Sequence, residues 1–435
     1  MACASSDSIG RGLPSLRARL ILSSCNRREI LDSSGISRFM KKEETFAKYS
    51  ICTMVSRVYN GNMEFGLGNL FKKKNTGVLG VDIGSSSIKV VQLKKKGDKA
   101  VLETYGELAL GPYANASVGQ ATKLSIQKLT EALRDLLNEK EVGLTTRNAG
   151  LAIPFSASLL SVIEMPNVPN KELETMVPIE ARKYIPVPIS EVTLDWSVIP
   201  RLEVDTHNEV SDEIKSKGVE AKTVDILLAA IHNNILSDYQ TIIDSTGLAA
   251  SFFEIELFSS MRSVLDEVGK TSLIVDLGAA STKLYIVERG VLRNSHIINR
   301  GAQDITANIA RINNISFEDA EVAKRNFGLA SGRTDIVIDQ GVHTAMEYIF
   351  SEINRVLYGY QTMYNKNIDQ AILIGGGAAL KGFNELASDS LKVPTISGDP
   401  FSKVEAPAFL EEILKQTGPE FAVSVGVALR KLKEL

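Results

Sequence analysis

Two stretches of the chain, a whole domain apart, repeat one pattern, and this duplication constrains the fold more than any other feature. VLGVDIGSSSIKVVQLKKKG begins at Val78, and SLIVDLGAASTKLYIVERG begins at Ser272. A repeat on this scale predicts two homologous units, each opening with a β-hairpin. Both copies contain Asp-x-Gly, four further residues and a Lys between apolar runs, at matched positions: Asp82, Gly84 and Lys89, then Asp276, Gly278 and Lys283.

The turn of each hairpin consists of small residues that suit phosphate binding. Gly, Ser and Ala leave successive backbone N–H groups open to phosphate oxygens, so two such turns would clamp a polyphosphate between two units. Asp82 and Asp276 would position Mg²⁺ through water, since Mg²⁺ keeps much of its hydration shell, and Lys89 would add a point charge. Taken singly, either turn is better interpreted as an ordinary hairpin, but the duplicated spacing favours the clamp.

A third glycine-rich element follows the second copy. In DQAILIGGGAALKGFNEL, an apolar run precedes Gly375, Gly376 and Gly377, and a helical pattern follows. Glycines after a strand let the backbone approach a flat ring or a phosphate, with helix N-terminal amides close by. A glycine triplet is often only a tight strand-to-helix turn. The position of this one, downstream of the second hairpin, is what indicates a nucleotide site.

Composition excludes several classes of function. The net charge of −3 supplies no basic field for nucleic acid, and no apolar run reaches the about 18 residues that span a bilayer. The three cysteines, Cys3, Cys25 and Cys52, all precede the first hairpin. The rest of the chain therefore has no disulfide framework and no thiolate metal site. We expect a soluble protein of the reducing cytoplasm.

The chain divides into a leader, two α/β units and an insertion. Residues 1–62 are rich in Ser and Arg and lack hydrophobic periodicity. We expect a disordered leader, or an upstream extension of a protein whose translation starts at Met63. The proline-punctuated stretch from Met165 to Leu248 has the character of an inserted subdomain, and its charged loop at 203–222 is interpreted as a solvated hairpin tip.

Two Asp-x-Gly hairpins in duplicated units, followed by Gly-Gly-Gly, resemble the actin-like ATPase superfamily, which includes actin, DnaK-type chaperones, sugar kinases and the division protein FtsA. Within it, the chain resembles the PilM family of type IV pilus assembly proteins from about Met63 to Leu435. GVDIGSSSIKVVQL is the most specific match, together with EMPNVPNKELETMVPIEARKYIPVPISEVTLDW, which is similar to the 1C subdomain of PilM and FtsA.

The resemblance implies an α/β protein of the actin-like ATPase fold, with two duplicated α/β domains around a nucleotide cleft and an inserted FtsA-like 1C subdomain. The two domains of this superfamily close around nucleotide, so binding biases their relative angle. The expected subdomains are 1A (63–165 plus 249–270), 1C (166–248), 2A (271–302 plus 371–435) and 2B (303–370).

The family's nucleotide contacts map onto this chain by position, and the resemblance implies ATP and Mg²⁺ as ligands. In FEDAEVAKRNFG, Glu321 and Lys324 resemble the pair that contacts ribose and adenosine, but their helical spacing is equally consistent with a surface salt bridge. The remaining expected contacts are Asp82, Gly84, Ser85, Ser86, Ser87 and Lys89, then Asp276, Gly278, Ala279, Ala280 and Ser281, then Gly301, and finally Gly375, Gly376 and Gly377 beside adenine.

One departure from the superfamily concerns catalysis. Members that hydrolyse ATP usually position the attacking water with a polar residue, often Gln, ahead of the second hairpin. The corresponding stretch SFFEIELFSSMRSVLDE has Glu254 and Glu256 but no Gln, and Glu254 is also consistent with a strand-face carboxylate. We expect ATP binding with weak or absent turnover.

The resemblance also implies a place in the cell and a partner. The protein would be cytoplasmic and peripheral at the inner membrane, reaching the membrane only through partners. The N-terminal segment of a PilN-like membrane protein would bind in a groove lined by Glu180, Arg182 and Tyr184 and by the edge near Pro154. PilN would connect the chain to the PilO/PilP alignment complex and the pilus motor ATPases, and a homo-oligomer is also compatible. Tyr184 and Trp196 are better interpreted as subdomain core.

Other classes of function give competing expectations. An FtsA-like division protein or cytoskeletal actin homologue would carry a C-terminal amphipathic membrane helix, whereas this sequence stops at LRKLKEL. A sugar kinase needs an acidic base in a substrate cleft, and a chaperone needs a substrate-binding domain; the sequence suggests neither. A scaffold without nucleotide turnover remains an alternative.

Overall fold

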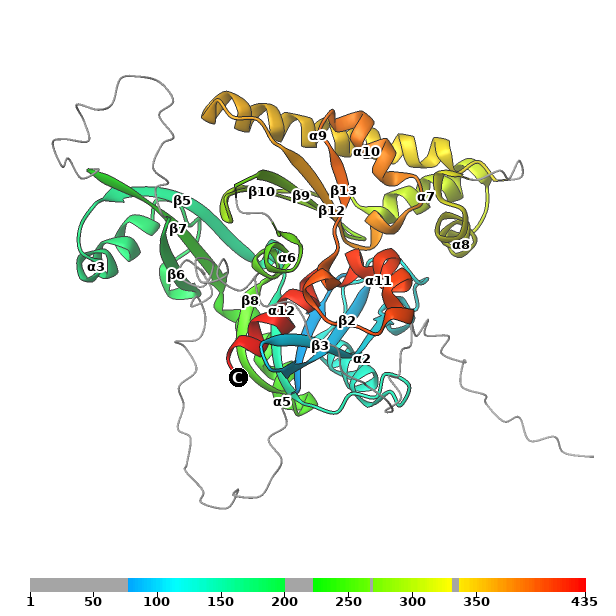
Figure 1. The fold of residues 1–435 in the computed structure, drawn as a ribbon, viewed down its shortest axis with the longest axis horizontal. Coiled ribbons are helices and arrows are strands. Elements are labelled where there is room, and N and C mark those ends of the chain that lie inside the picture. Colours follow the sequence, from blue (N-terminus) through cyan, green and yellow to red (C-terminus); the bar gives the residue numbers. More distant parts are fainter. Residues whose placement is uncertain (1–76, 200–221, 267–268, 331–335) are drawn as a thin grey trace, which may run out of the picture.

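The described residues form three β-sheets, and the two larger ones share one strand order (Figure 1). The computed structural model describes residues 77–199, 222–266, 269–330 and 336–435. The first sheet, in the order β3-β2-β1-β4-β8, comprises β1 (Gly77–Ile83), β2 (Ser87–Lys96), β3 (Lys99–Ala109), β4 (Asn148–Ile153) and β8 (Ala249–Ile255). The second, in the order β11-β10-β9-β12-β13, comprises β9 (Thr271–Leu277), β10 (Thr282–Glu288), β11 (Val291–Ile298), β12 (Gln370–Ile374) and β13 (Thr395–Ser397).

The hairpins that open the two sheets pair in the same register. β1 runs antiparallel to β2 with Asp82 opposite Lys89, and β9 runs antiparallel to β10 with Asp276 opposite Lys283. Each first strand then pairs in parallel with the next strand along its sheet, β1 with β4 and β9 with β12. The predicted duplication is therefore present in the topology as well as in the sequence.

The two turns are also closed in the same way. The Gly84 N–H donates to the carbonyl oxygen of Ser87 at 3.0 Å, and the Gly278 N–H donates to that of Ser281 at 3.0 Å. A Cβ on either glycine would come within about 3 Å of the same carbonyl oxygen, at 3.0 Å for Gly84 and 3.1 Å for Gly278. A side chain there would crowd the turn, so glycine fits this point of both copies without displacing the carbonyl group that closes the turn.

Helices cover both faces of the first sheet, as the alternation of side chains along β1 requires. Leu79 and Val81 belong to a cluster that includes α2 (Ile126–Asn138) and α5 (Asn233–Thr246). The alternate residues of β1 point to the opposite face of the sheet. Val78 shares a cluster with residues of α12 (Ala422–Lys433), and α6 (Glu256–Val264) lies beside α12.

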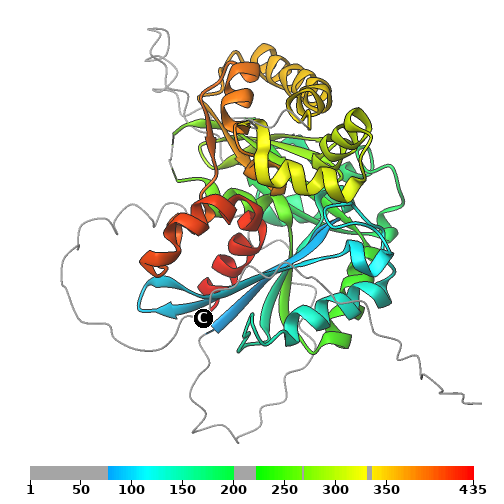
Figure 2. The ribbon, with the colours of Figure 1, turned by 90° about the vertical axis from the view of Figure 1, so that its right-hand side faces the viewer.

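The C-terminal helix α12 packs on the first sheet, which corrects the assignment of 371–435 to the second unit (Figure 2). The chain returns from the second sheet through α11 (Glu411–Thr417). A Cβ at Gly80 of β1 would overlap the carbonyl oxygen of Ser424 in α12, and one at Gly426 of α12 would overlap that of Ser259 in α6. Backbone-to-backbone contacts that only glycine permits thus hold α12 between the first sheet and α6.

The second sheet has its own set of helices. Their buried side chains form one cluster with those of β9, β10 and β12. α9 packs on α7 at Gly341, where a Cβ would lie 2.7 Å from Cγ1 of Ile309. The helices are α7 (Ala302–Asn313), α8 (Phe317–Phe327), α9 (Asp339–Tyr364) and α10 (Phe383–Leu391).

A third, antiparallel sheet projects to one side of the molecule (Figure 1). Its order is β5-β7-β6, from β5 (Ser158–Pro166), β6 (Val192–Ile199) and β7 (Thr223–His232), and α3 (Asn170–Ala181) packs on it through Leu173 and Val177.

The boundaries of this sheet differ from the expected insertion at 166–248. β5 already belongs to it, whereas α5 packs on α2 beside the first sheet, because its apolar face completes that core. The predicted loop at 203–222 lies almost wholly outside the described residues, and the predicted leader at 1–62 lies entirely outside them.

Replacing Gly426 by Ala is expected to destabilise the protein, because the added methyl group would overlap the Ser259 carbonyl oxygen. Overpacking of this kind costs about 1–3 kcal/mol, which urea denaturation followed by circular dichroism measures. Gly359→Ala is the matched control: Gly359 also lies within a helix, with nothing within 4 Å of its Cβ position, so the change should be neutral or slightly stabilising. Equal stability of the two variants would contradict the close packing of α12 on α6.

Candidate functional site

One cavity of about 240 Å³ lies between the hairpins of the two larger sheets. It brings together residues that are far apart in the sequence and that come from both halves of the molecule. Of the expected site residues, all but Gly301 line it: Asp82, Gly84, Ser85, Ser86, Ser87, Lys89, Asp276, Gly278, Ala279, Ala280, Ser281, Glu321, Lys324, Gly375, Gly376 and Gly377.

Gly301 lies behind the second turn rather than on the cavity wall. It precedes α7, and its N–H donates to Oδ2 of Asp304 at 2.9 Å. A Cβ on Gly301 would lie 2.5 Å from the carbonyl oxygens of both Gly278 and Ala279. The next residue, Ala302, donates its N–H to the carbonyl oxygen of Gly278 at 2.8 Å. Gly301 therefore allows the first turn of α7 to pack directly against the hairpin turn.

Lys89 of the first hairpin is held at the cavity wall by neighbours on β2 and β3. Its Nζ donates to Oγ of Ser87 at 2.6 Å and lies 3.1 Å from Oε1 of Glu107. Burial alone would lower the pKa of Lys89, but the charges of Glu107 and Glu420 raise it above its ordinary value. Lys89 is therefore a fixed positive charge beside the first turn. Glu107, which the sequence did not single out, also lines the cavity.

Lys283, at the matching position of the second hairpin, has different partners. Its Nζ lies 2.8 Å from Oε2 of Glu256 and 3.2 Å from Oδ2 of Asp276. The other oxygen of Glu256 accepts the Phe155 N–H at 2.6 Å. Burial opposes the charge, but Asp276 and Glu256 raise the pKa of Lys283 well above its ordinary value. Glu256 thus ties the second hairpin to the segment between β4 and β5.

The carboxyl group of Asp82 lies among charges of both signs. Burial raises its pKa most; Lys89 and Lys283 lower it, Glu256 and Asp276 raise it, and the result is a pKa of about 7. Part of the side chain is open to the cavity, so water there screens these effects.

The residues present fit a hydrated Mg²⁺ better than a dedicated metal cage. Among the described residues, no group of three or more His, Cys, Asp or Glu side chains has the arrangement to hold a metal ion. Asp82 and Asp276 instead line the cavity from separate hairpins. Two carboxylates suit an ion that keeps most of its water and takes its other ligands from a phosphate.

The glycine triplet lies against the end of β9. Gly375 has a φ of +86°, in the left-handed region that favours glycine, and a Cβ there would lie 2.5 Å from Oδ1 of Asp276. A Cβ on Gly377 would press equally close to the side chain of Leu277. The Gly375 N–H donates to the carbonyl oxygen of Pro419 at 2.9 Å. These glycines let the backbone at the start of a short 3-10 helix (Gly376–Ala379) form one wall of the cavity.

Glu321 and Lys324 form an ion pair in the cavity wall rather than on the surface. Lys324 Nζ lies 2.6 Å from one Glu321 oxygen, and Arg325 Nε lies 2.6 Å from the other. Glu321 is only 4% exposed, and it also accepts a hydrogen bond from the Thr306 hydroxyl. Arg325, which the sequence analysis did not single out, lines the cavity as well. Its spacing of four residues from Glu321 on one helix could have indicated this ion pair.

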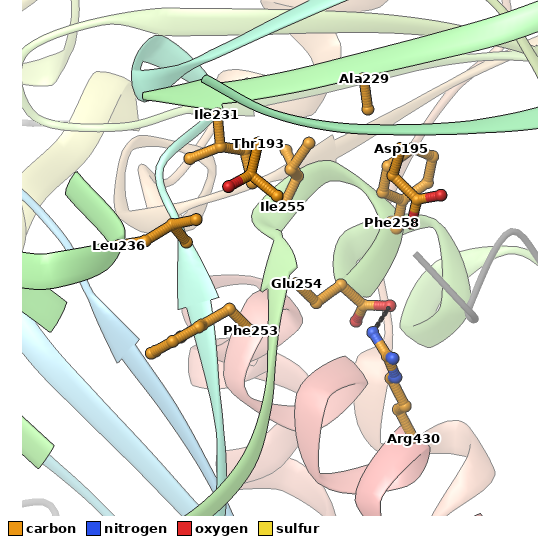
Figure 3. Close-up of a pocket in the computed structure, with 10 residues that line it drawn as sticks. All are labelled: Thr193, Asp195, Ala229, Ile231, Leu236, Phe253, Glu254, Ile255, Phe258 and Arg430. Carbon is orange, nitrogen blue, oxygen red and sulfur yellow. Dashed lines mark hydrogen bonds and ion pairs between the residues drawn. The ribbon is translucent and has the colours of Figure 1, made fainter. Parts of the chain in front are cut away.

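Glu254, the other carboxylate expected ahead of the second hairpin, is not among the residues that line this cavity, and its side chain points toward Arg430 (Figure 3). It lies beside a small space of about 20 Å³ between the third sheet and α12. Arg262 contacts both its oxygens at 2.7 Å, and Arg430 lies 3.1 Å away. Burial would raise the pKa of Glu254, but Arg262 and Arg430 lower it to about 2. Its role is therefore structural, as the alternative interpretation proposed.

Comparisons with known proteins identify the fold. A family model described as "Type IV pilus assembly protein PilM" matches residues 80–432. The solved "PilM-PilN type IV pilus biogenesis complex" has a TM-score of 0.67 and 26% identity, covering 82% of this chain and 98% of that one. The cell division protein FtsA of Neisseria meningitidis serogroup B is 24% identical over 350 residues, 74% of this chain and 83% of the relative. These likenesses confirm the predicted actin-like ATPase fold.

Glu254→Gln is expected to destabilise the protein by about 3 kcal/mol at pH 6, because it leaves the buried Arg430 and the largely buried Arg262 without their carboxylate. The folded-state pKa of about 2 lies below the ordinary 4.5. The stabilisation is therefore present above about pH 4.5 and is lost as the pH falls towards 2. Urea denaturation at several pH values should show the gap between wild type and variant narrowing below pH 4.5.

Glu174→Gln is the control for this series. Glu174 is exposed on α3, and a surface change of this kind shifts stability by no more than about 0.5 kcal/mol. A difference between wild type and Glu254→Gln that stays constant from pH 6 down to pH 3 would contradict the buried ion pair.

Proposed function

Because the chain belongs to the family of the type IV pilus assembly protein PilM, we propose that it is an ATP-binding component of pilus assembly whose nucleotide state controls the binding of a PilN-like segment. The observation that carries this proposal is the single cavity in which both hairpin turns and the glycine triplet meet. Two matched phosphate-binding turns facing one space have a clear use only if a polyphosphate lies between them.

The cavity offers distinct surfaces to the parts of a nucleotide. The small residues of the two turns would bind the phosphates through their backbone N–H groups, with Lys89 as a neighbouring charge. Asp82 and Asp276 would hold the water shell of Mg²⁺, which would neutralise phosphate charge when bound. The backbone wall at Gly375–Gly377 would accept the flat adenine ring, and Glu321 and Lys324 would lie beside the ribose.

Weak turnover is the expected consequence of the way Glu256 is held. It is the carboxylate of the expected catalytic stretch that lines the cavity. Both of its oxygens are already engaged, one by the Phe155 N–H and the other by Lys283. Activating a water molecule would require one of these contacts to break. We therefore propose that nucleotide binding, rather than hydrolysis, is the main activity of the site.

The same contacts offer a route from the cavity to the proposed partner groove. Glu256 joins Lys283 of the second hairpin to Phe155, which follows Pro154 in the short turn that leads into β5. A ligand that moves the second hairpin relative to the first sheet would act on this edge through that ion pair. Tyr184, in the turn that follows α3, is 42% exposed, so the interpretation of this residue as core is wrong.

The partner proposal rests on the family and on the solved likeness, whose title names a complex of PilM with PilN. An extended PilN-like peptide would bind in the groove by main-chain hydrogen bonds and side-chain pockets. Through it the protein would reach the PilO/PilP complex and the motor ATPases at the cytoplasmic face of the inner membrane. Among the described residues, no helix is both long enough and apolar enough to cross a membrane.

Lys89→Ala and Asp82→Asn are each expected to weaken ATP binding about ten- to hundredfold, the range for losing one charge-assisted contact. Lys94→Ala is the matched control: Lys94 lies on the same strand, is 52% exposed and is not among the residues that line the cavity. Isothermal titration calorimetry measures the three affinities. Equal affinity of the Lys89 and Lys94 variants would contradict binding between the hairpins.

Co-purification tests the partner. A synthetic peptide with the N-terminal sequence of the host's PilN-like protein, immobilised on resin, should retain the wild type more strongly with ATP and Mg²⁺ than without. Tyr184→Ala should weaken retention in both conditions, whereas Tyr358→Ala, an exposed tyrosine on α9, should not. Equal retention with and without ATP would exclude coupling between nucleotide and partner. Weaker retention of the Tyr358→Ala variant alone would mean that the partner binds elsewhere on the molecule.

A further inference from the structure

The segment between β3 and α2 reaches from the first hairpin to the second half of the molecule. We call residues 115–122 the strap. Thr122, at its end, donates its N–H to the carbonyl oxygen of Ser85 in the first turn at 2.8 Å. The preceding residue, Ala121, donates its N–H to Oε1 of Gln303 in α7 at 3.1 Å. The strap therefore connects elements that belong to different halves.

Gln303 is in turn joined to the second hairpin. Its backbone N–H donates to the carbonyl oxygen of Ala279 at 3.1 Å. A chain of hydrogen bonds thus runs from Ser85 through the strap and Gln303 to Ala279. Both ends of this chain are turn residues that line the cavity, so the strap links the two proposed phosphate-binding turns to each other.

Packing at Gly119 also brings the strap against the second half of the molecule. Gly119 lines the cavity and has a φ of +85°, in the left-handed region that favours glycine. A Cβ at this position would lie 2.6 Å from Oε1 of Glu321 in α8. Glu321 is held by its ion pairs with Lys324 and Arg325 and cannot easily move aside. The strap can therefore lie against α8 only because residue 119 has no side chain.

We propose that the strap closes the cavity and that the Ala121–Gln303 hydrogen bond is its latch, so that a nucleotide enters or leaves only after the latch opens. The proposal rests on the proposed function, since the cavity must bind nucleotide for passage to matter. The latch is present in the ligand-free molecule, so it has to open before entry as well as before release. It therefore slows both rates and changes the affinity less than either rate.

Gln303→Ala removes the acceptor of the latch without touching a residue that lines the cavity. Dissociation of a fluorescent ATP analogue, measured by stopped flow, is expected to become about three- to tenfold faster, the range that one net hydrogen bond supplies. Association should become faster as well. Gln340→Ala, the same change at an exposed position on α9, is the control and should leave both rates unchanged.

Gly119→Ala tests the packing of the strap independently. Its methyl group would press on Glu321, so we expect faster dissociation here too. Gly97→Ala is the matched control, because Gly97 also has a positive φ, +62°, with nothing within 4 Å of its Cβ position. Both variants carry backbone strain, but only the change at Gly119 should alter the rates.

Amide exchange of the strap gives a readout that needs no nucleotide. Peptides covering 115–122 should exchange faster in Gln303→Ala than in the wild type, while those from the Gln340→Ala control should not change. If the wild type binds the analogue but neither the rates nor the exchange respond to Gln303→Ala and Gly119→Ala, the strap proposal is overturned and the nucleotide site stands. Failure of the wild type to bind any nucleotide would overturn the proposed function and this inference together.

Discussion

The whole site depends on one turn geometry used twice: an Asp opposite a Lys across the hairpin, closed by a hydrogen bond from glycine to a residue three positions on. Each turn ends a hairpin whose first strand pairs in parallel with the next strand of its sheet. Because the two sheets have the same order, both turns can face one cavity. Neither turn alone would bound this cavity.

The two matched lysines of the hairpins pair with carboxylates in different parts of the molecule and therefore differ in what they connect. Lys89 is paired with Glu107 within the first sheet, so it remains local to the first turn. Lys283 is paired with Glu256, which also binds Phe155 in the first half, so it joins the halves. The strap contact at Gln303 links the same two halves through other residues. The halves are therefore joined by two separate sets of contacts near the turns. A nucleotide bound between the two turns, as we propose, would therefore bear on the relative position of the halves.

Local motifs made the hairpins, the glycine triplet and the α/β class predictable, because each depends on residues adjacent in sequence. Long-range contacts were not predictable in the same way. Glu107 reaches the cavity only because β3 lies beside β2, and α12 packs on β1 through Gly80, a small residue whose partner is near the far end of the chain. Glu254 and Glu256 are two residues apart, yet one is buried among arginines at the end of β8 and the other faces the cavity from α6.

The most direct test of the central claim is a crystal structure of the full chain with a non-hydrolysable ATP analogue and Mg²⁺. Density for the phosphates is expected between Ser85–Ser87 and Ala279–Ser281, with the base against Gly375–Gly377. An analogue bound elsewhere on the molecule, or crystals that hold none at saturating concentration, would contradict the claim that the paired turns form a nucleotide site.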